Sequence, residues 1–349
     1  MRKNTLFIRV DSSTKIGNGH FIRCMALADT LKKNFEINFI SRSLEGNLIS
    51  NIQQKGFTVF RFYSNSKKIN IKNDAQKTIA IIRKYGNPKN MLIVDNYELS
   101  KKWETYMKPY VYKLIVIDDL PHRSHNCDLL IDQNLHSKVN GLYEGLIPSK
   151  CIKLIGPKFS MIRNEFRMIR KSAKPRTFPI KKLLVSFGGT DIEKQTIVVL
   201  NFIKKINMKI NVDVVVGKAN RCKKIIKNFC DKNKHFTFHE QIDNIASLML
   251  SADLAIGSTG ITTWERCCLG LPAIVSISSN NQRDTANELS KKKCIINLGD
   301  VKKLKESSYI NVITNLKKND LRNMSKNSMS LVDGNGTQRI FKHILLMGK

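Results

Sequence analysis

A small-residue turn followed by an acidic residue is the stretch of this chain best suited to bind a ligand. The apolar run 252–256 has the length of a strand, and the helix expected at about 261–269 follows it directly after the turn. A helix that begins there aims free backbone N–H groups and the positive end of its dipole at the sheet edge, which favours a phosphate. Glu265 is negative and suits the two hydroxyls of a ribose instead. The turn consists of Ser258, Thr259 and Gly260. The pattern predicts a nucleotide diphosphate site.

The same turn also has an ordinary explanation, because βαβ units commonly have small residues at this point. Two further features favour a ligand site over a plain turn. Glu265 lies on the helix, and Asn281 and Gln282 follow the next expected strand, 273–277.

A second candidate group lies where the strand 5–10 passes into the helix 21–31. Gly17 and Gly19 permit close approach or unusual dihedral angles, and His20 falls at the helix N-terminus. Because a helix N-terminus disfavours the imidazolium, His20 is expected to be uncharged and able to accept a proton. This suits a general base, while the alternative is a histidine that only caps the helix.

Polar residues also follow other expected strands. Asn96 and Tyr97 come after the strand 91–95, although such residues are common in ordinary turns. A pair of glycines ahead of a helix cap forms a second backbone donor loop, which is more informative. This loop consists of Phe187, Gly188 and Gly189. It lacks the G-x-G-x-x-G spacing and the P-loop lysine, so neither dinucleotide nor ATP chemistry is supported.

Potential metal ligands occur at His122, His125, Cys127 and Asp128. Their irregular spacing in a strand-end loop fits solvent-exposed turn residues better than a zinc site. The eight cysteines contain no C-x-x-C pair, so free thiols in a reducing cytoplasm are expected rather than metal ligands or disulfides. We therefore expect no metal and no cofactor.

Composition limits the class of protein. A length of 349 residues predicts two domains, and 42% hydrophobic with 25% charged residues is ordinary for a globular chain. The net charge of +32 could steer anionic substrates, but the lysines are spread out without aromatic residues between them, which argues against nucleic-acid binding. No apolar run approaches a membrane span. We expect a cytoplasmic monomer without an integral membrane segment, and peripheral membrane contact stays open.

Strands and helices alternate in both halves of the chain, which predicts α/β domains with mostly parallel sheets. The polar, proline-containing stretch 171–179 marks the expected boundary. The sequence thus predicts two Rossmann-like domains, 1–170 and 180–349, whose sheets face a cleft. The C-terminal helix is free to cross back to the first domain.

Motifs along nearly the whole chain occur in an order that resembles a known family. They are residues 9–20, 23–27, 94–97, 117–119, 156–159 with Arg163, 186–191 and 257–272. The family is PseG, the UDP-2,4-diacetamido-2,4,6-trideoxy-β-L-altropyranose hydrolases of bacterial pseudaminic acid synthesis. The resemblance implies a GT-B fold related to MurG, with UDP held by the second domain.

The resemblance also implies roles for individual residues. His20 matches the general base, which activates a water that attacks the anomeric carbon with inversion and expels UDP. Tyr97 matches a residue near the sugar, while Glu265 and Asn281 match nucleotide and sugar contacts. The remaining expected substrate contacts are Asp11, Gly17, Gly19, Asn96, Arg163, Phe187, Gly188, Gly189, Ser258, Thr259, Gly260 and Gln282.

Hydrolysis of this kind requires neither a metal nor a paired general acid, because UDP is a good leaving group. Val10 and Thr190 depart from the family pattern and leave the particular sugar open. Two other functions also stay open. One is a MurG-like glycosyltransferase that uses a UDP-sugar donor and a hydroxyl acceptor, and the other is a non-catalytic nucleotide- or RNA-binding protein.

Overall fold

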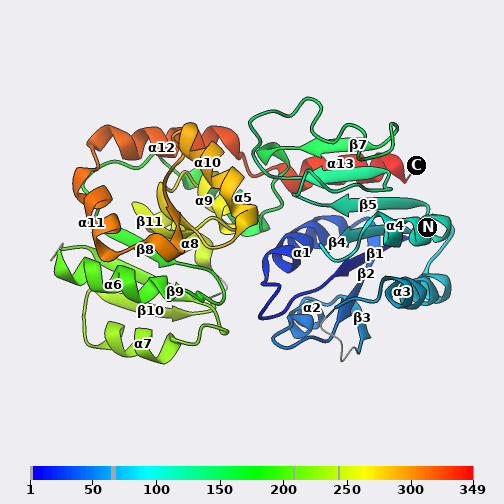
Figure 1. Ribbon diagram of the computed structural model, residues 1–349, viewed down its shortest axis with the longest axis horizontal. Helices are drawn as coiled ribbons and strands as arrows, with labels where there is room; N and C mark the ends of the chain where they lie inside the picture. Colours follow the sequence, from blue (N-terminus) through cyan, green and yellow to red (C-terminus); the bar gives the residue numbers. More distant parts are fainter. Residues whose placement is uncertain (1–2, 64–67, 207–208, 243, 349) are drawn as a thin grey trace. The chain divides into compact units, whose positions relative to one another are not determined.

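The computed structural model describes residues 3–63, 68–206, 209–242 and 244–348. Contacts within the chain divide it into two compact units, residues 1–163 with 335–349 and residues 164–334. Each unit has one parallel sheet with helices packed on it (Figure 1), which confirms the predicted α/β class.

The first unit is built on a sheet in the order β3-β2-β1-β4-β5-β6-β7. Its strands are β1 (Asn4–Val10), β2 (Phe35–Arg42), β3 (Thr58–Phe62), β4 (Met91–Asp95), β5 (Lys113–Ile117), β6 (Leu129–Asp132) and β7 (Ile152–Ile155). Its helices are α1 (Gly19–Leu31), α2 (Ile49–Gln54), α3 (Ile71–Tyr85), α4 (Lys101–Met107) and α13 (Gly336–Met347), with the 3₁₀ turns η1 (Lys108–Tyr110) and η2 (Pro157–Phe159).

Alternation along the buried strands gives this sheet two apolar faces. Leu6 and Ile8 of β1 point into a core that is covered by α1 and α13. Phe7, between them, points into a second core that is covered by α3 and α4. A strand buried on both faces reads as a continuous apolar run, which explains why the sequence indicated most of these strands. The short edge strand β7 was not predicted, because Ile152 and its neighbour are exposed and the apolar run is interrupted.

The second unit is built on a sheet in the order β10-β9-β8-β11-β12-β13. Its strands are β8 (Lys182–Ser186), β9 (Asn211–Val216), β10 (Phe236–Glu240), β11 (Leu254–Ser258), β12 (Ala273–Ile277) and β13 (Ile295–Asp300). Its helices are α5 (Asn164–Ile169), α6 (Gln195–Lys205), α7 (Lys223–Asp231), α8 (Ile245–Ser251), α9 (Thr262–Cys268), α10 (Arg283–Lys291), α11 (Glu306–Asn315) and α12 (Lys318–Leu331), with η3 (Arg170–Ser172), η4 (Asn280–Gln282) and η5 (Val301–Lys303).

The two units divide at positions that differ from the expected limits, 1–170 and 180–349. Helix α5 precedes the connector 171–179, yet it groups with the second unit, because Phe166 is fully buried and the helix packs against α8 and α9. Helix α13 groups with the first unit, where it packs against α1.

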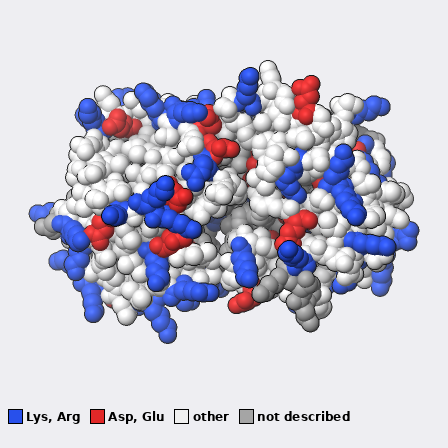
Figure 2. Space-filling model, viewed as in Figure 1, with Lys and Arg blue, Asp and Glu red and all other residues white. Residues whose placement is uncertain are grey.

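Basic side chains are spread over the surface (Figure 2). On the face in view, lysine and arginine are scattered among uncharged residues, and acidic side chains are fewer. All eight cysteines are buried and free.

Candidate functional site

The first unit places His20 where its sheet changes direction. β1 lies between β2 and β4, so the chain builds one side of the sheet first and then returns to build the other. Ligands of open α/β sheets bind at such a point, beyond the carboxyl ends of the strands. His20 is the second residue of α1 and Asp95 is the last residue of β4. The fold therefore joins two residues that lie 75 positions apart in the sequence.

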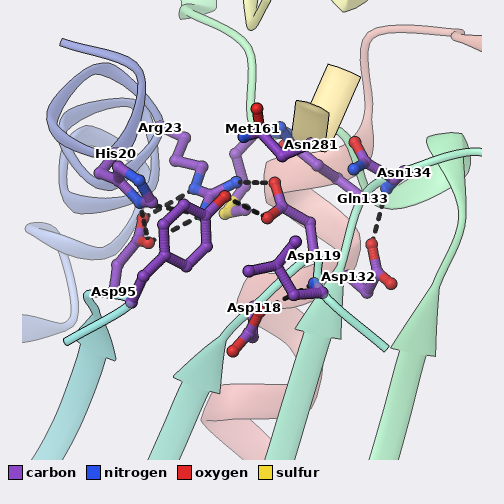
Figure 3. Close-up of polar contacts among 12 residues, drawn as sticks. His20, Arg23, Asp95, Asp118, Asp119, Asp132, Gln133, Asn134, Met161 and Asn281 are labelled. Atoms are coloured by element: carbon purple, nitrogen blue, oxygen red, sulfur yellow. Dashed lines mark hydrogen bonds and ion pairs between the residues drawn. The ribbon is translucent and has the colours of Figure 1, made fainter. Parts of the chain in front are cut away.

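His20, Arg23 and Asp95 form one hydrogen-bonded group (Figure 3). Nδ1 of His20 lies 2.5 Å from Oδ1 of Asp95. Nε and Nη2 of Arg23 donate to the two oxygens of Asp95, each over 2.7 Å. Asp95 and Arg23 are buried, whereas the His20 side chain keeps 11% of its surface exposed. The carboxylate is thus fixed and the imidazole stays partly accessible.

The proton between His20 and Asp95 belongs to the imidazole. Burial opposes the charge on Asp95, but the guanidinium of Arg23, together with the hydrogen bond from His20, holds the pKa of this carboxyl well below its usual value. An ionised carboxylate only accepts hydrogen bonds, so Nδ1 of His20 is the donor. Nη2 of Arg23 also lies 3.1 Å from Nδ1, but it already donates to Asp95 over a shorter distance. With Nδ1 as the donor, Nε2 is the ring nitrogen through which a general base would accept a proton.

Tyr97 and Asp119 extend this group to the end of β5. The Tyr97 hydroxyl donates a short hydrogen bond to Oδ1 of Asp119, and Nη1 of Arg23 donates to Oδ2 over 2.9 Å. The Tyr97 ring meets the His20 ring edge-on, with centroids 4.5 Å apart. Arg23 therefore links two carboxylates, one beside each ring.

A buried histidine, His125, holds the loop that follows β5. The expectation that His125 and Cys127 are exposed is wrong, since they are 1% and 2% exposed. Nδ1 of His125 lies 2.7 Å from Oε1 of Glu104. Nε2 lies 3.0 Å from Oδ2 of Asp118, an ion-pair distance that is poorly aligned for a hydrogen bond. Burial alone would lower the pKa of His125, but Asp118 and Glu104 raise it to about 9. Glu104 is itself buried in α4, so this contact ties the loop to that helix.

Asp11 lies in a separate buried ionic cluster. Its carboxylate accepts from Nη1 of Arg9 over 2.6 Å, from Nε of Arg42 over 2.8 Å and from Nδ2 of Asn96 over 2.8 Å. Burial opposes the charge, but mainly Arg9, with Arg42, lowers the pKa of Asp11 to about 2. Asp11 thus fixes the ends of β1, β2 and β4 to one another, and a direct substrate contact from Asp11 or Asn96 stays a prediction.

The two glycines before His20 leave space around the loop. Gly17 has a φ of +80°, a conformation that favours glycine, and its N–H donates to the carbonyl of Ser13. Gly19 begins α1 with ordinary dihedral angles. No described heavy atom lies within 4 Å of a Cβ position on either glycine.

The second unit brings its two small-residue loops together in a similar way. β8 and β11 are neighbours where this sheet changes direction. A Cβ on Gly257 would lie 2.0 Å from the carbonyl oxygen of Ser186, so the two strand ends approach closely only because Gly257 has no side chain. In the loop after β8, Phe187 is buried, Gly188 is exposed with a φ of +83°, and Gly189 is half-buried. The carboxylate of Asp191 then accepts from the backbone N–H groups of residues 195 and 196 and caps α6.

The loop after β11 contains a buried hydroxyl whose hydrogen-bonding capacity is unused. Thr259 is 4% exposed, and its Oγ1 has no hydrogen-bond partner within the described part of the chain. Next to it, Gly260 has open space where a Cβ would be. The carbonyl of Ser258 accepts from Nη2 of Arg266, and burial lowers the pKa of Arg266 to about 10. A buried polar atom without a partner calls for an explanation, and a ligand group is one.

The other expected contacts of this part of the chain differ in exposure. Glu265 is completely buried within α9, which the sequence analysis did not foresee. Asn281 is exposed in η4 and accepts from Oγ of a neighbouring serine over 2.6 Å. Gln282 is half-buried and accepts from Oγ of Ser278 over 3.2 Å. Arg163, the last residue before the second unit, is half-buried.

Two residues that organise the group around His20 were not singled out as site residues. Arg23 lies three positions after His20, a spacing that places both on one face of a helix, and this signal could have indicated it. Asp119 had no such signal, because the sequence does not tell which carboxylate of the pair 118–119 turns toward His20.

Comparison with solved structures identifies the architecture. MurG of Acinetobacter baumannii superposes with a TM-score of 0.67 at 11% identity, over 98% of this chain and 99% of that one. The chain has the GT-B fold. In addition, residues 183–344 match the glycosyltransferase family 28 C-terminal domain.

Two curated relatives are similar in sequence. The UDP-2,4-diacetamido-2,4,6-trideoxy-β-L-altropyranose hydrolase of Campylobacter jejuni is 28% identical over 82% of this chain and 96% of its own length. An uncharacterized protein of Methanocaldococcus jannaschii is 28% identical over 87% of this chain, but the match spans only 61% of that relative.

The described residues contain neither a membrane-spanning helix nor a metal-binding cluster. None of the helices there is long and apolar enough to cross a membrane. Within the same residues, no three His, Cys, Asp or Glu side chains are grouped so that they could hold a metal ion.

Proposed function

We propose that this protein hydrolyses a UDP-linked 2,4-diacetamido-2,4,6-trideoxyhexose to the free sugar and UDP, in nonulosonic (pseudaminic) acid biosynthesis. The observation that carries the proposal is the partly accessible imidazole of His20, whose Nδ1–H is held by the buried carboxylate of Asp95. The similarity to the Campylobacter hydrolase supports the class of substrate, and the match to the family 28 domain supports a nucleotide-sugar enzyme more generally.

In the proposed reaction, Nε2 of His20 removes a proton from a water molecule as the water oxygen attacks the anomeric carbon. The bond from that carbon to the β-phosphate oxygen breaks, and its electron pair leaves on UDP, so the configuration inverts. Asp95 stabilises the imidazolium that forms, and Arg23 keeps Asp95 ionised and in place.

The proposal assigns UDP to the second unit. Backbone N–H groups of the loops 186–191 and 257–260 and the unused hydroxyl of Thr259 would hold the diphosphate. Glu265 would accept from the ribose hydroxyls, and Asn281 and Gln282 would contact the sugar. Tyr97, beside His20, would contact the sugar from the first unit.

The second candidate function is a MurG-like glycosyltransferase. The observation that favours it is the match of residues 183–344 to a glycosyltransferase domain. The same base would then activate an acceptor hydroxyl in place of water.

An acceptor-free assay separates the two candidates. Purified protein is incubated with the UDP-sugar and EDTA, and the anomeric proton signal is followed by NMR. We expect free sugar and UDP to appear in equal amounts. Turnover only after addition of a hydroxyl acceptor would favour the transferase, and a requirement for added magnesium would contradict the metal-independent mechanism.

Substitution of the base tests its role. His20→Asn is expected to lower kcat about 10²–10⁴-fold, the usual contribution of a general base. UDP should still bind with unchanged affinity, because the proposal assigns UDP to other residues. Undiminished turnover in His20→Asn would show that His20 is not the general base. If the wild-type protein did not bind UDP, the assignment of the nucleotide to the second unit would be wrong.

A further inference from the structure

A small cavity lies in the first unit at the ends of β2 and β3 and the beginning of α3. Its volume is about 100 Å³, and its lining includes Arg42, Phe62, Lys68, Asn70, Asp74 and Lys77. A water molecule occupies roughly 30 Å³ of liquid, so the cavity has room for a few waters or one tetrahedral oxyanion. The proposed reaction uses none of these side chains.

Arg42 lines this cavity, and one of its side-chain donors has no partner among the described residues. The residue is only 3% exposed, and its Nε and Nη2 donate to Asp11 and Glu98. Its Nη1 is buried and finds no hydrogen-bond acceptor in any described residue. A buried guanidinium N–H without an acceptor costs free energy, and a bound anion would remove that cost.

The charges that line the cavity also favour an anion. Three cations, Arg42, Lys68 and Lys77, line the cavity with one carboxylate, Asp74, and Arg42 is also paired with Asp11 and Glu98. The charge of Asp74 is partly compensated, because Asp74 accepts from Nε and Nη2 of Arg9, which also binds Asp11, over 3.3 and 2.7 Å and from the indole N–H of Trp103 over 3.0 Å. Its charge therefore does not exclude a second anion nearby.

The remaining walls suit a phosphate that enters from the surface. Asn70 caps the N-terminus of α3, a helix of 15 residues whose dipole favours negative charge at this end. Phe62 closes one side, with Nζ of Lys77 5.8 Å from its ring centroid. Lys68, Asn70 and Lys77 are exposed, so the cavity opens to solvent.

We propose that this cavity binds a phosphate group, either inorganic phosphate or the phosphate of a small monoester, at a site distinct from the residues around His20. Arg42 would bind the anion through Nη1 while its Nε stays on Asp11, which in turn holds Asn96 at the start of the β4–α4 loop. Occupancy of the cavity would thereby stiffen the loop that carries Tyr97.

The test is a titration of the full-length protein with inorganic phosphate and, separately, with a hexose 1-phosphate, by calorimetry at physiological salt and with saturating UDP present. We expect saturable binding of at least one of them. Lys77→Gln removes a lining cation and should weaken this binding roughly tenfold, the effect of one charge-assisted hydrogen bond.

Lys72→Gln is the matched control. Lys72 is exposed on the same helix and carries the same charge, but it does not line the cavity. We expect it to change the affinity less than twofold. Arg42→Lys, which keeps the charge and removes Nη1, should weaken binding as Lys77→Gln does. Any of three results would overturn the proposal. They are equal effects of the Lys72 and Lys77 variants on the affinity, binding of phosphate that UDP abolishes, and no saturable binding of either compound.

Discussion

Arg23 holds the side chains that surround the candidate base, His20. It is buried, and it donates to both oxygens of Asp95 and to Asp119, which in turn accepts from Tyr97. A buried guanidinium that is bound on several sides holds its partners at fixed positions, because losing any one contact leaves a charge without compensation. The geometry of His20 therefore depends on Arg23 and Asp95, neither of which touches the substrate in the proposed reaction.

Asp95→Asn tests this positioning role. The amide keeps the shape, but it can offer an N–H to Nδ1 and so favour the wrong tautomer of His20. We expect kcat to fall by about 10²–10⁴-fold while UDP affinity stays unchanged. Calorimetry with UDP and the acceptor-free assay give the two readouts. An activity within a few fold of the wild type would show that Asp95 does not orient the base.

His125 predicts a stability that depends on pH. Its folded pKa of about 9 lies above the usual value near 6.5. Because the pKa of His125 is higher in the folded protein than in the unfolded chain, the protonated side chain stabilises the fold. This stabilisation is complete at pH values below the unfolded pKa and is lost as the pH rises through 9. The loss amounts to up to ~3 kcal/mol. Urea unfolding of the wild type and of His125→Gln between pH 6 and 9.5 measures it. The difference between the two proteins should shrink as the pH rises, and a constant difference would contradict the buried ion pair.

At the level of elements, both units place their candidate loops beside the pair of strands where the sheet changes direction. These pairs are β1 with β4 and β8 with β11. The positions follow from parallel topology, since the carboxyl ends of the strands share one edge. The close approach of β11 to β8 further requires a glycine at position 257.

Gly257→Ala tests this requirement. Its Cβ would lie 2.0 Å from a backbone oxygen of β8, so the strands must separate. We expect a loss of about 1–3 kcal/mol in the free energy of unfolding. Gly260→Ala, in the same loop, is the control, because open space surrounds its Cβ position and its φ is not positive. Equal stability of both variants, measured by urea unfolding, would refute the packing argument.

The sequence was sufficient to predict most elements and insufficient to predict the side-chain network. Apolar runs such as β1 and β11 indicate strands because their periodicity depends only on local burial. The contact between His20 and Asp95 depends on strand order, which periodicity does not contain. The burial of His125 was missed for the same reason, since Glu104 of a separate helix covers it. Strand β7 was missed because exposed residues interrupt its pattern, and β13 was missed because only its first residue is buried.

On the scale of the whole molecule, the chain returns to its first unit at the end. Helix α13 contributes Ile340 and Ile344, both fully buried, to the core beneath α1. A Cβ on Gly336, its first residue, would lie 2.2 Å from the carbonyl oxygen of Ser160, so the helix enters this core closely packed. The first unit is therefore complete only with residues from both ends of the chain.

Ile340→Ala should destabilise the first unit by about 2–5 kcal/mol, as large-to-small changes in a core do. Leu346→Ala, on the same helix but 65% exposed, should change stability by less than ~0.5 kcal/mol. Differential scanning calorimetry compares the two. If both variants unfolded like the wild type, α13 would not be part of the core.

The central claim is that water, activated by His20, attacks the anomeric carbon of a UDP-sugar. The most direct measurement is turnover of the UDP-linked diacetamido-trideoxyhexose in ¹⁸O-labelled water without an acceptor, followed by mass spectrometry of both products. The account predicts one ¹⁸O atom in the released sugar, unlabelled UDP, and formation of both products slowed about 10²–10⁴-fold in His20→Asn. Label in the β-phosphate of UDP, or no release of sugar without an acceptor, would contradict it.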